Sequence, residues 1–142
     1  MARAATVAAG VATLTMAGLT GSASASADAV RQDVCFVGAC GSATVSFHDK
    51  YRATVSMSVA DTKCDGHAAK VRIKARQYSY SNQTWYTYKG PWHYNKSGCH
   101  GGYKAWNGLG FRGEDPTSYM TVEICNDGVY CRTSGALDSP YY

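Results

Sequence analysis

From Ser42 onward, apolar and polar residues alternate with a period of two in one short segment after another. Such alternation places apolar side chains on one face of a β-strand and polar side chains on the other. The segments that show it, or that carry the β-branched and aromatic residues typical of strands, are 43–47, 51–59, 70–76, 84–89, 103–106, 119–124 and 129–133. Turn residues such as Asp65-Gly66 separate them, and no helical stripe follows residue 27. The pattern predicts an all-β fold, a small antiparallel β-sandwich or small barrel of about seven strands.

Residues 1–27 have the three parts of a secretory signal peptide. Arg3 gives a basic start, residues 4–19 are rich in Ala, Val and Leu, and residues 20–27 contain Ala-x-Ala cleavage patterns. Gly and Thr interrupt the apolar stretch, which is shorter than the ~20 apolar residues of a spanning helix, so a cleaved signal is favoured over a retained anchor. We predict cleavage after Ala27 and a secreted, extracellular domain of residues 28–142 with no stable membrane insertion.

All six cysteines follow residue 27, so they are expected to meet an oxidising compartment and to form disulfides. Short spacing favours two local bridges, Cys35–Cys40 and Cys125–Cys131, which leaves Cys64–Cys99 as a long-range bridge. The alternative is a metal site that uses Cys64, His67, Cys99 and His100. Their spacings match no paired zinc knuckle, and exported thiols are usually oxidised, so no metal and no cofactor are predicted.

Four cations alternate along one predicted strand: Lys70, Arg72, Lys74 and Arg76. Alternate residues of a strand stand ~6.5–7 Å apart on one face, so the four form a ladder. A ladder of this kind suits a phosphate backbone, an anionic wall polymer or an acidic partner. The plain alternative is a charged solvent face that prevents association of sheets, with Asp61, Asp65 and Glu123 as candidates to neutralise part of it.

The net charge argues against nucleic acid as the partner. The chain has 14 Lys and Arg against 10 Asp and Glu, and one of these cations, Arg3, lies in the predicted signal, which leaves about +3. This excess is too small to imply a polyanionic partner by itself.

Aromatic residues crowd the segment that follows the ladder. Because Trp85 and Tyr86 are adjacent in one predicted strand, they face opposite sides, so some rings lie outside the core. Exposed Tyr and Trp are common at binding surfaces, where flat rings stack on other flat groups. The alternative is a core poor in Leu and Ile that recruits aromatic side chains from both sides. The candidate binding residues are Trp85, Tyr86, Tyr88, Trp92, Tyr94 and Trp106, together with the four ladder cations.

Support for catalysis is thin, and no catalytic residue is predicted. The four histidines are scattered, and neither Gly-x-Ser-x-Gly nor His-Glu-x-x-His occurs. Glu114 and Asp115 are adjacent in a predicted turn, where they make a poor acid–base pair. A small nuclease or other hydrolase with Glu114 or Glu123 as base is the second alternative for the function.

The whole predicted mature chain, residues 28–142, resembles the small uncharacterised exported cysteine-containing β proteins of actinobacteria. The resemblance rests on the signal ending Ser-Ala-Ser-Ala, the strand 69–73, the segment 122–131 and the end Pro140-Tyr141-Tyr142. That group implies no established activity. The architecture is also similar to that of small secreted amylase and protease inhibitors of such bacteria, although the Trp-Arg-Tyr tripeptide of the amylase inhibitors is missing.

The sequence therefore predicts a secreted, non-catalytic protein that binds through a Tyr/Trp-rich, basic-rimmed surface. The expected partner is a glycan, a cell-wall polymer or another extracellular protein. The first alternative is an inhibitor of an extracellular hydrolase.

Overall fold

The computed structural model describes residues 28–128 and 130–142, and the regular structure of this part of the chain is all β. The predicted signal peptide, residues 1–27, lies outside the described residues. The strands are β1 (Val30–Phe36), β2 (Ala39–Phe47), β3 (Arg52–Asp61), β4 (Ala69–Ser79), β5 (Thr84–Lys89), β6 (His93–Asn95), β7 (Tyr103–Arg112), β8 (Thr117–Asn126), β9 (Tyr130–Thr133) and β10 (Leu137–Asp138). In this part of the chain no helix is long and apolar enough to cross a bilayer.

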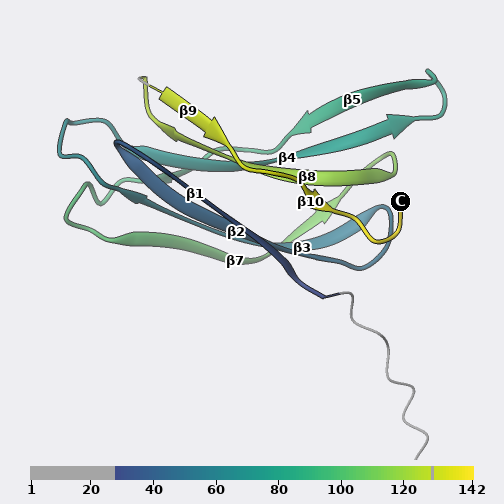
Figure 1. Cartoon of the computed structure of the whole chain (residues 1–142), viewed down its shortest axis with the longest axis horizontal. Helices are drawn as coiled ribbons and strands as arrows, with labels where there is room; N and C mark the ends of the chain where they lie inside the picture. The colour runs from purple at the N-terminus through teal and green to yellow at the C-terminus, as the bar shows by residue number, and fades with distance from the viewer. Residues whose placement is uncertain (1–27, 129) are drawn as a thin grey trace, which may run out of the picture.

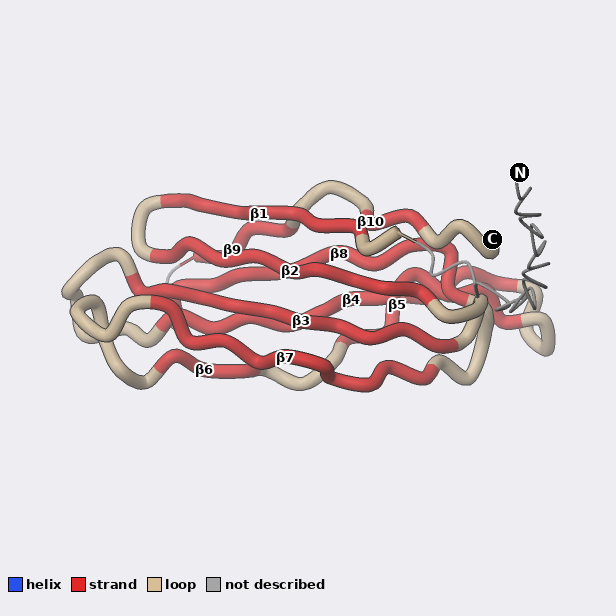
Figure 2. Tube along the Cα trace, turned by 90° about the horizontal axis from the view of Figure 1, so that it is seen from below, coloured by secondary structure: helices blue, strands red, loops and turns tan. Residues whose placement is uncertain are grey.

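The strands form two antiparallel sheets that stack face to face as a sandwich (Figure 1). The first sheet has the order β1-β2-β3-β7, and the second has the order β10-β8-β4-β5, in which β6 also pairs with β4 and β9 with β8. Figure 2 shows that the strands run along the long axis of the molecule. Along one side β1 contacts β9 and β10, whereas on the other side the β4–β5 hairpin diverges from the first sheet toward its tip (Figure 1).

The all-β sandwich is confirmed, but the expected number of about seven strands is too low, since the described residues form ten. The strands β1, β6 and β10 have no counterpart among the expected segments. β6 and β10 have three and two residues, too few for a period-two pattern to be recognised. β1 does alternate, but the polar residue Gln32 lies in its inward row and weakens the pattern.

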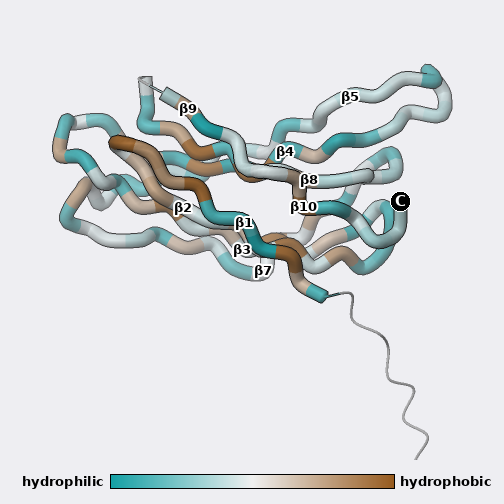
Figure 3. Tube along the Cα trace, viewed as in Figure 1, coloured by the Kyte–Doolittle hydropathy of each residue, from teal (hydrophilic) through white to brown (hydrophobic). Residues whose placement is uncertain are grey.

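The inward rows of both sheets form one core, in which β-branched residues are frequent. Its fully covered side chains include Val45, Val59, Val71, Val122 and Ile124. Complete burial of one such side chain stabilises the fold by about 1.5–3 kcal/mol. Figure 3 shows the alternation as brown and teal bands along the strands. Trp106, Leu109 and Phe111 of β7 pack against this core but stay partly exposed at its rim.

All three predicted disulfides are present. Cys35–Cys40 and Cys125–Cys131 each join directly opposite residues of neighbouring strands, β1 with β2 and β8 with β9. Cys64–Cys99 joins the loop between β3 and β4 to the loop between β6 and β7. This bridge uses both sulfur atoms of the alternative metal site, and His100 Nε2 lies 3.7 Å from Cys64 Sγ. Three disulfides in a small β fold are consistent with an extracellular protein.

Candidate functional site

The four cations of the predicted ladder lie on one face of β4. Along this strand the residues at odd positions from 69 to 79 are buried, and the residues between them are half-buried on the opposite face. Because the buried row joins the core, Lys70, Arg72, Lys74 and Arg76 face away from the other sheet. The row continues through Tyr78, which is next on the same face.

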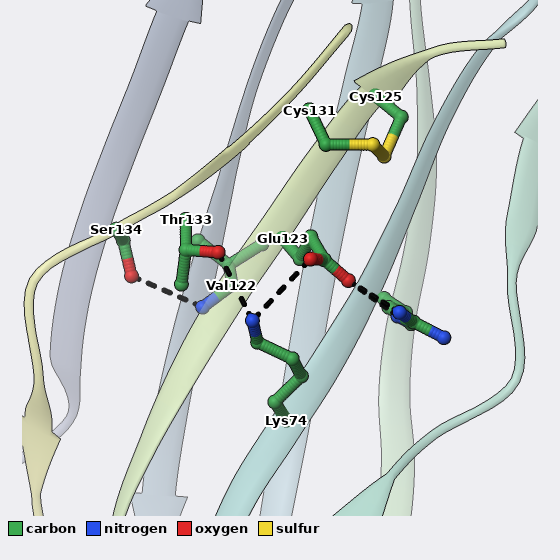
Figure 4. A network of polar contacts seen from close by, with 8 residues as sticks. Lys74, Val122, Glu123, Cys125, Cys131, Thr133 and Ser134 are labelled. Carbon is green, nitrogen blue, oxygen red and sulfur yellow. Dashed lines mark hydrogen bonds and ion pairs between the residues drawn. A yellow bond between two sulfur atoms is a disulfide. The ribbon is translucent and has the colours of Figure 1, made fainter. Parts of the chain in front are cut away.

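Carboxylates from the neighbouring strand and loop compensate three of the four cations. Glu123 of β8 lies opposite Arg72. Its carboxylate forms ion pairs with Arg72 Nη2 at 2.6 Å and with Lys74 Nζ at 3.3 Å. Figure 4 shows Lys74 between Glu123 and Thr133, to which it also donates a hydrogen bond of 3.1 Å. Lys70 forms an ion pair with Asp127. The ladder is therefore mostly a row of paired charges.

The pKa values of these two carboxyl groups agree with that pairing. Partial burial raises the pKa of Glu123, but the hydrogen bond from Arg72 and the charges of Lys74 and Arg72 outweigh it, so the pKa lies below its ordinary value. The hydrogen bond from Lys70 lowers the pKa of Asp127. Both groups are anionic at neutral pH.

Of the three acidic residues that were candidates to neutralise the ladder, only Glu123 does so. Asp65 forms an ion pair with Lys63 at 3.5 Å. Asp61 is buried and accepts a hydrogen bond from the Lys63 backbone. Asp127, the partner of Lys70, is the compensating residue that the sequence pattern did not reveal, because it lies in the turn after β8 and not in a strand.

Arg76 and Lys89 remain without a carboxylate partner among the described residues. Arg76 Nη1 donates to Thr87 Oγ1 at 3.3 Å, and Thr87 is its neighbour on β5. Lys89 lies opposite Lys74 on the same face and is exposed. Free positive charge is thus concentrated at the β5 side of the ladder.

Aromatic rings cover the other end of the ladder. The guanidinium of Arg72 lies 4.1 Å from the Trp92 ring centre, and Lys70 Nζ lies 4.9 Å from the same centre. Lys70 also lies 5.5 Å from the ring centre of Tyr94, its neighbour across β6. The chain reaches this position because Pro91 interrupts the strand and Gly90 N donates to Ile73 O at 2.9 Å, which holds the loop against β4.

A second group of rings lies at the far end of the same face. Tyr78 and Trp85 are opposite each other on β4 and β5, with ring centres 5.2 Å apart. Tyr80 and Tyr142 extend the group, at 5.2 Å from Tyr78 and 5.3 Å from Trp85. The Arg76 guanidinium lies 5.6 Å from the Trp85 ring. Rings at both ends and cations between them form what we call the aromatic–cation face: Lys70, Arg72, Lys74, Arg76, Tyr78, Trp85, Trp92 and Tyr94.

The structure places the three other candidate residues elsewhere. Tyr86 and Tyr88 lie opposite the buried residues Gln77 and Ala75, so they point to the inner side of β5. Tyr86 Oη donates to Asp115 Oδ2 at 3.0 Å, and burial, together with this hydrogen bond, raises the pKa of Tyr86. Trp106 on β7 lies opposite buried Met57.

One of these inward rings, Tyr88, lines a cleft between β5 and β7. Its cavity of about 230 Å³ is lined by Val55, Met57, Ile73, Tyr88, Gly90, Pro91, His93, Leu109, Gly110 and Phe111. Tyr88 and Phe111 approach each other across it, with ring centres 5.8 Å apart. The candidate residues therefore divide between the outer face of the second sheet and the inner side of the sandwich.

Tyr78 and Tyr142 are among the residues of the outer face that were absent from the candidate set. Tyr78 continues the even-numbered row of the ladder, and that register alone places it on this face. Tyr142 is at the other end of the sequence and gives no signal of this kind. It reaches Trp85 because β10 pairs with β8 and Ser139 N donates to Ser118 O at 2.8 Å.

No protein-family model matches this chain, and comparison with curated protein sequences finds no match either. Its function is therefore inferred from the geometry of its surfaces.

Proposed function

We propose that this chain is a secreted, non-catalytic protein that binds a glycan or a sugar-based wall polymer through the aromatic–cation face. The observation that carries the proposal is the gathering of Trp85, Trp92 and Tyr94 on the same face as the ladder. The faces of a sugar ring present C–H groups and its edge presents hydroxyls. Indole and phenol rings pack against the C–H faces, and guanidinium and carboxylate groups form hydrogen bonds with the hydroxyls.

Compensation of the ladder favours a glycan over a strongly anionic chain. A phosphate backbone gains affinity by neutralising free cations, but Lys70, Arg72 and Lys74 already have carboxylate partners. Among the cations that the structure describes on β4 and β5 of this face, only Arg76 and Lys89 are free to attract an anion. The carboxylates of Glu123 and Asp127 would repel an anionic ligand, but they can accept hydrogen bonds from the hydroxyl groups of a sugar.

The dimensions of the face favour a polymer. Lys70 and Tyr78 are eight residues apart on one strand, a distance of roughly 26 Å. Rings lie near both ends of this span, Trp92 beside Lys70 and Trp85 beside Tyr78. A linear ligand can therefore contact both ring groups at once, which a single sugar cannot.

Two observations support secretion. Three disulfides are typical of proteins that act in an oxidising compartment. The sequence of residues 1–27 has the order of parts that export signals have.

The test is co-sedimentation of the oxidised protein with insoluble glycans and purified cell walls. We expect retention of the wild type, and weakening by about 5- to 100-fold for each of Trp85→Ala and Trp92→Ala, since one stacked ring contributes about 1–3 kcal/mol. The matched control is Tyr103→Ala. Tyr103 is also an exposed aromatic residue, with 63% of its surface accessible, but it lies on β7 of the first sheet, away from the aromatic–cation face.

Three outcomes would contradict the proposal. The wild type fails to sediment with any polymer, or Tyr103→Ala weakens binding as much as the Trp variants do. The third is stoichiometric inhibition of an amylase or protease by a protein that ignores polymers, which would favour the inhibitor alternative.

A further inference from the structure

The first sheet has two edge strands, β1 and β7, and they differ in protection. β1 contacts β9 and β10, is joined to β2 by Cys35–Cys40, and carries an ion pair of 2.8 Å between Arg31 and Asp33. β7 has ten residues and pairs only with β3 among the described residues, although its Trp106 ring lies 5.1 Å from the His93 ring of β6 in the second sheet. One side of β7 thus presents backbone N–H and C=O groups without a strand partner, a ready template for another strand.

Cations mark both ends of β7. Lys104 and Arg112 are exposed, and neither has a carboxylate within ion-pair distance among the described residues. Arg112 also lies directly opposite Arg52, whose own charge is compensated by Asp49 at 2.6 Å. The strand therefore combines an open edge with one uncompensated positive charge at each end.

Between these charges the inner side of β7 is apolar. Trp106, Leu109 and Phe111 are partly buried, and the last two line the cleft together with Tyr88 of the opposite sheet. A strand added to the free edge of β7 places alternate side chains on this same side. Those side chains would cover the exposed parts of Leu109 and Phe111 at the mouth of the cleft.

We propose that β7 is a docking edge for an extended peptide segment of another protein, apolar in its centre and acidic near both ends. Strand addition supplies affinity through the backbone, and the cleft and the two cations supply selectivity. Lys104 and Arg112 are eight residues apart, roughly 26 Å along the strand, so the segment has about nine residues. Lys104 lies opposite buried Val59 and Arg112 lies opposite exposed Arg52, so the two cations face opposite sides of the sheet and the segment needs an acidic residue on the inner side at one end and on the outer side at the other.

A second copy of this chain is a poor occupant. Antiparallel pairing of two β7 strands places the Lys104 end of one copy beside the Arg112 end of the other, so each end of the contact gathers two positive charges. The irregularity in the pairing of β3 with β7, between Val55 and Met57, further discourages a flat edge-to-edge contact. The charges favour an acidic partner.

The experiment uses the whole oxidised protein and synthetic peptides of about nine alternating valines and threonines. One peptide has two adjacent glutamates at each end, so that each end presents a carboxylate to both sides of the strand, and the other has two adjacent lysines at each end. We expect the glutamate peptide to bind the wild type, and the double variant Lys104→Glu/Arg112→Glu to bind it at least ~10-fold more weakly while gaining affinity for the lysine peptide. Exchange of charges on both partners distinguishes direct contact from a loss of folding.

The matched control is Arg132→Glu, which reverses an exposed cation on β9 of the other sheet and should leave peptide affinity unchanged. Hydrogen exchange adds a second readout, since strand addition should slow exchange at alternate β7 amides and leave those of β1 unchanged. The proposal is overturned if neither peptide binds, if the charge exchange fails to reverse the preference, or if sedimentation shows dimers that the β7 variants abolish. Glycan binding by the aromatic–cation face is independent of every one of these outcomes.

Discussion

The outer faces of the two sheets have the same alternating pattern but very different side chains. On the first sheet, β2 and β3 present cross-strand pairs of small hydroxyl residues: Ser42 with Ser58, Thr44 with Ser56, and Ser46 with Thr54. On the second sheet, the corresponding positions of β4, β5 and β8 hold indole, phenol, guanidinium and carboxylate groups. Serine and threonine are sufficient for a solvent-exposed, soluble face. Solubility alone therefore does not explain the large aromatic and charged side chains on the outer face of the second sheet.

The difference also has an energetic side. Ordering long side chains such as those of Arg72 and Lys74 costs up to about 2 kcal/mol each in lost rotamer freedom, whereas serine costs little. On the second sheet this cost is partly offset by contacts within the face, such as Arg72 on Trp92 and on Glu123. The aromatic–cation face is thus a pre-ordered surface, which lowers the entropy that a ligand must remove on binding.

The largest expected effect concerns the disulfide that encloses most of this face. Cys64–Cys99 closes a loop of 35 residues that contains β4, β5 and β6, whereas Cys35–Cys40, in the first sheet, closes only 5. Replacing Cys64 and Cys99 by serine should lower the free energy of unfolding by about 4 kcal/mol, against about 2 kcal/mol for Cys35 and Cys40, because the longer loop gains more unfolded-state entropy. Urea unfolding followed by circular dichroism measures both. Equal losses would show that the second sheet does not depend specifically on its long-range bridge.

A smaller effect is expected at the ion pairs. Glu123→Gln should destabilise the fold by about 1–2 kcal/mol, because it leaves half-buried Arg72 and Lys74 without a carboxylate. Thr44→Ala on the first sheet should change stability by less than about 0.5 kcal/mol.

The same variant makes a prediction about pH. The folded pKa of Glu123 lies below its ordinary value, so its contribution is complete above the unfolded pKa of about 4.3 and is lost as the pH falls through the folded pKa. Wild type and Glu123→Gln should therefore approach each other in stability during acid titration. A difference that is constant from pH 7 to pH 3 would show that the carboxylate charge is unimportant.

The smallest effect concerns salt. If a wall polymer with some negative charge binds the aromatic–cation face, log K should fall with log salt with a slope of no more than about 2, since Arg76 and Lys89 are the only cations of β4 and β5 on this face without a carboxylate partner in the described part of the chain. Arg76→Gln/Lys89→Gln should remove most of this slope, and Lys70→Gln should preserve it. A slope near 4 for the wild type would mean that the ladder binds as four free cations.

Much of the fold could be predicted from the sequence because period-two alternation is a local signal. Residues 51–59 and 70–76 alternate strictly, and all of them except Tyr51 lie within central strands. Spacing also identified the disulfides, since Cys35 and Cys125 each have a close partner, which leaves one remaining pair. The short strands β6 and β10 could not be predicted, because their position depends on β4 and β8 and not on a pattern of their own.

The candidate site could be predicted only in part. Alternation placed the four ladder cations on one face, and the opposite orientations of Trp85 and Tyr86 follow from the same rule. The alternation of residues could not place Trp92, because Trp92 lies in the loop between β5 and β6. Its ring reaches the ladder because that loop is held against β4. The same limit applies to Trp106, whose side of the molecule depends on how β7 pairs with β3.

The sequence alone determined that the chain forms strands, which residues of each strand share a face, and which cysteines pair, because these properties depend on neighbouring positions and on spacing. Only the tertiary structure decided which faces come together and which charges remain free. Asp127 and Tyr142 show why: each acts on the second sheet from a turn or a terminus that the pairing of β8 with β4 and of β10 with β8 brings there. Contacts between residues so far apart in sequence arise from packing of the sheets, and no local pattern encodes them.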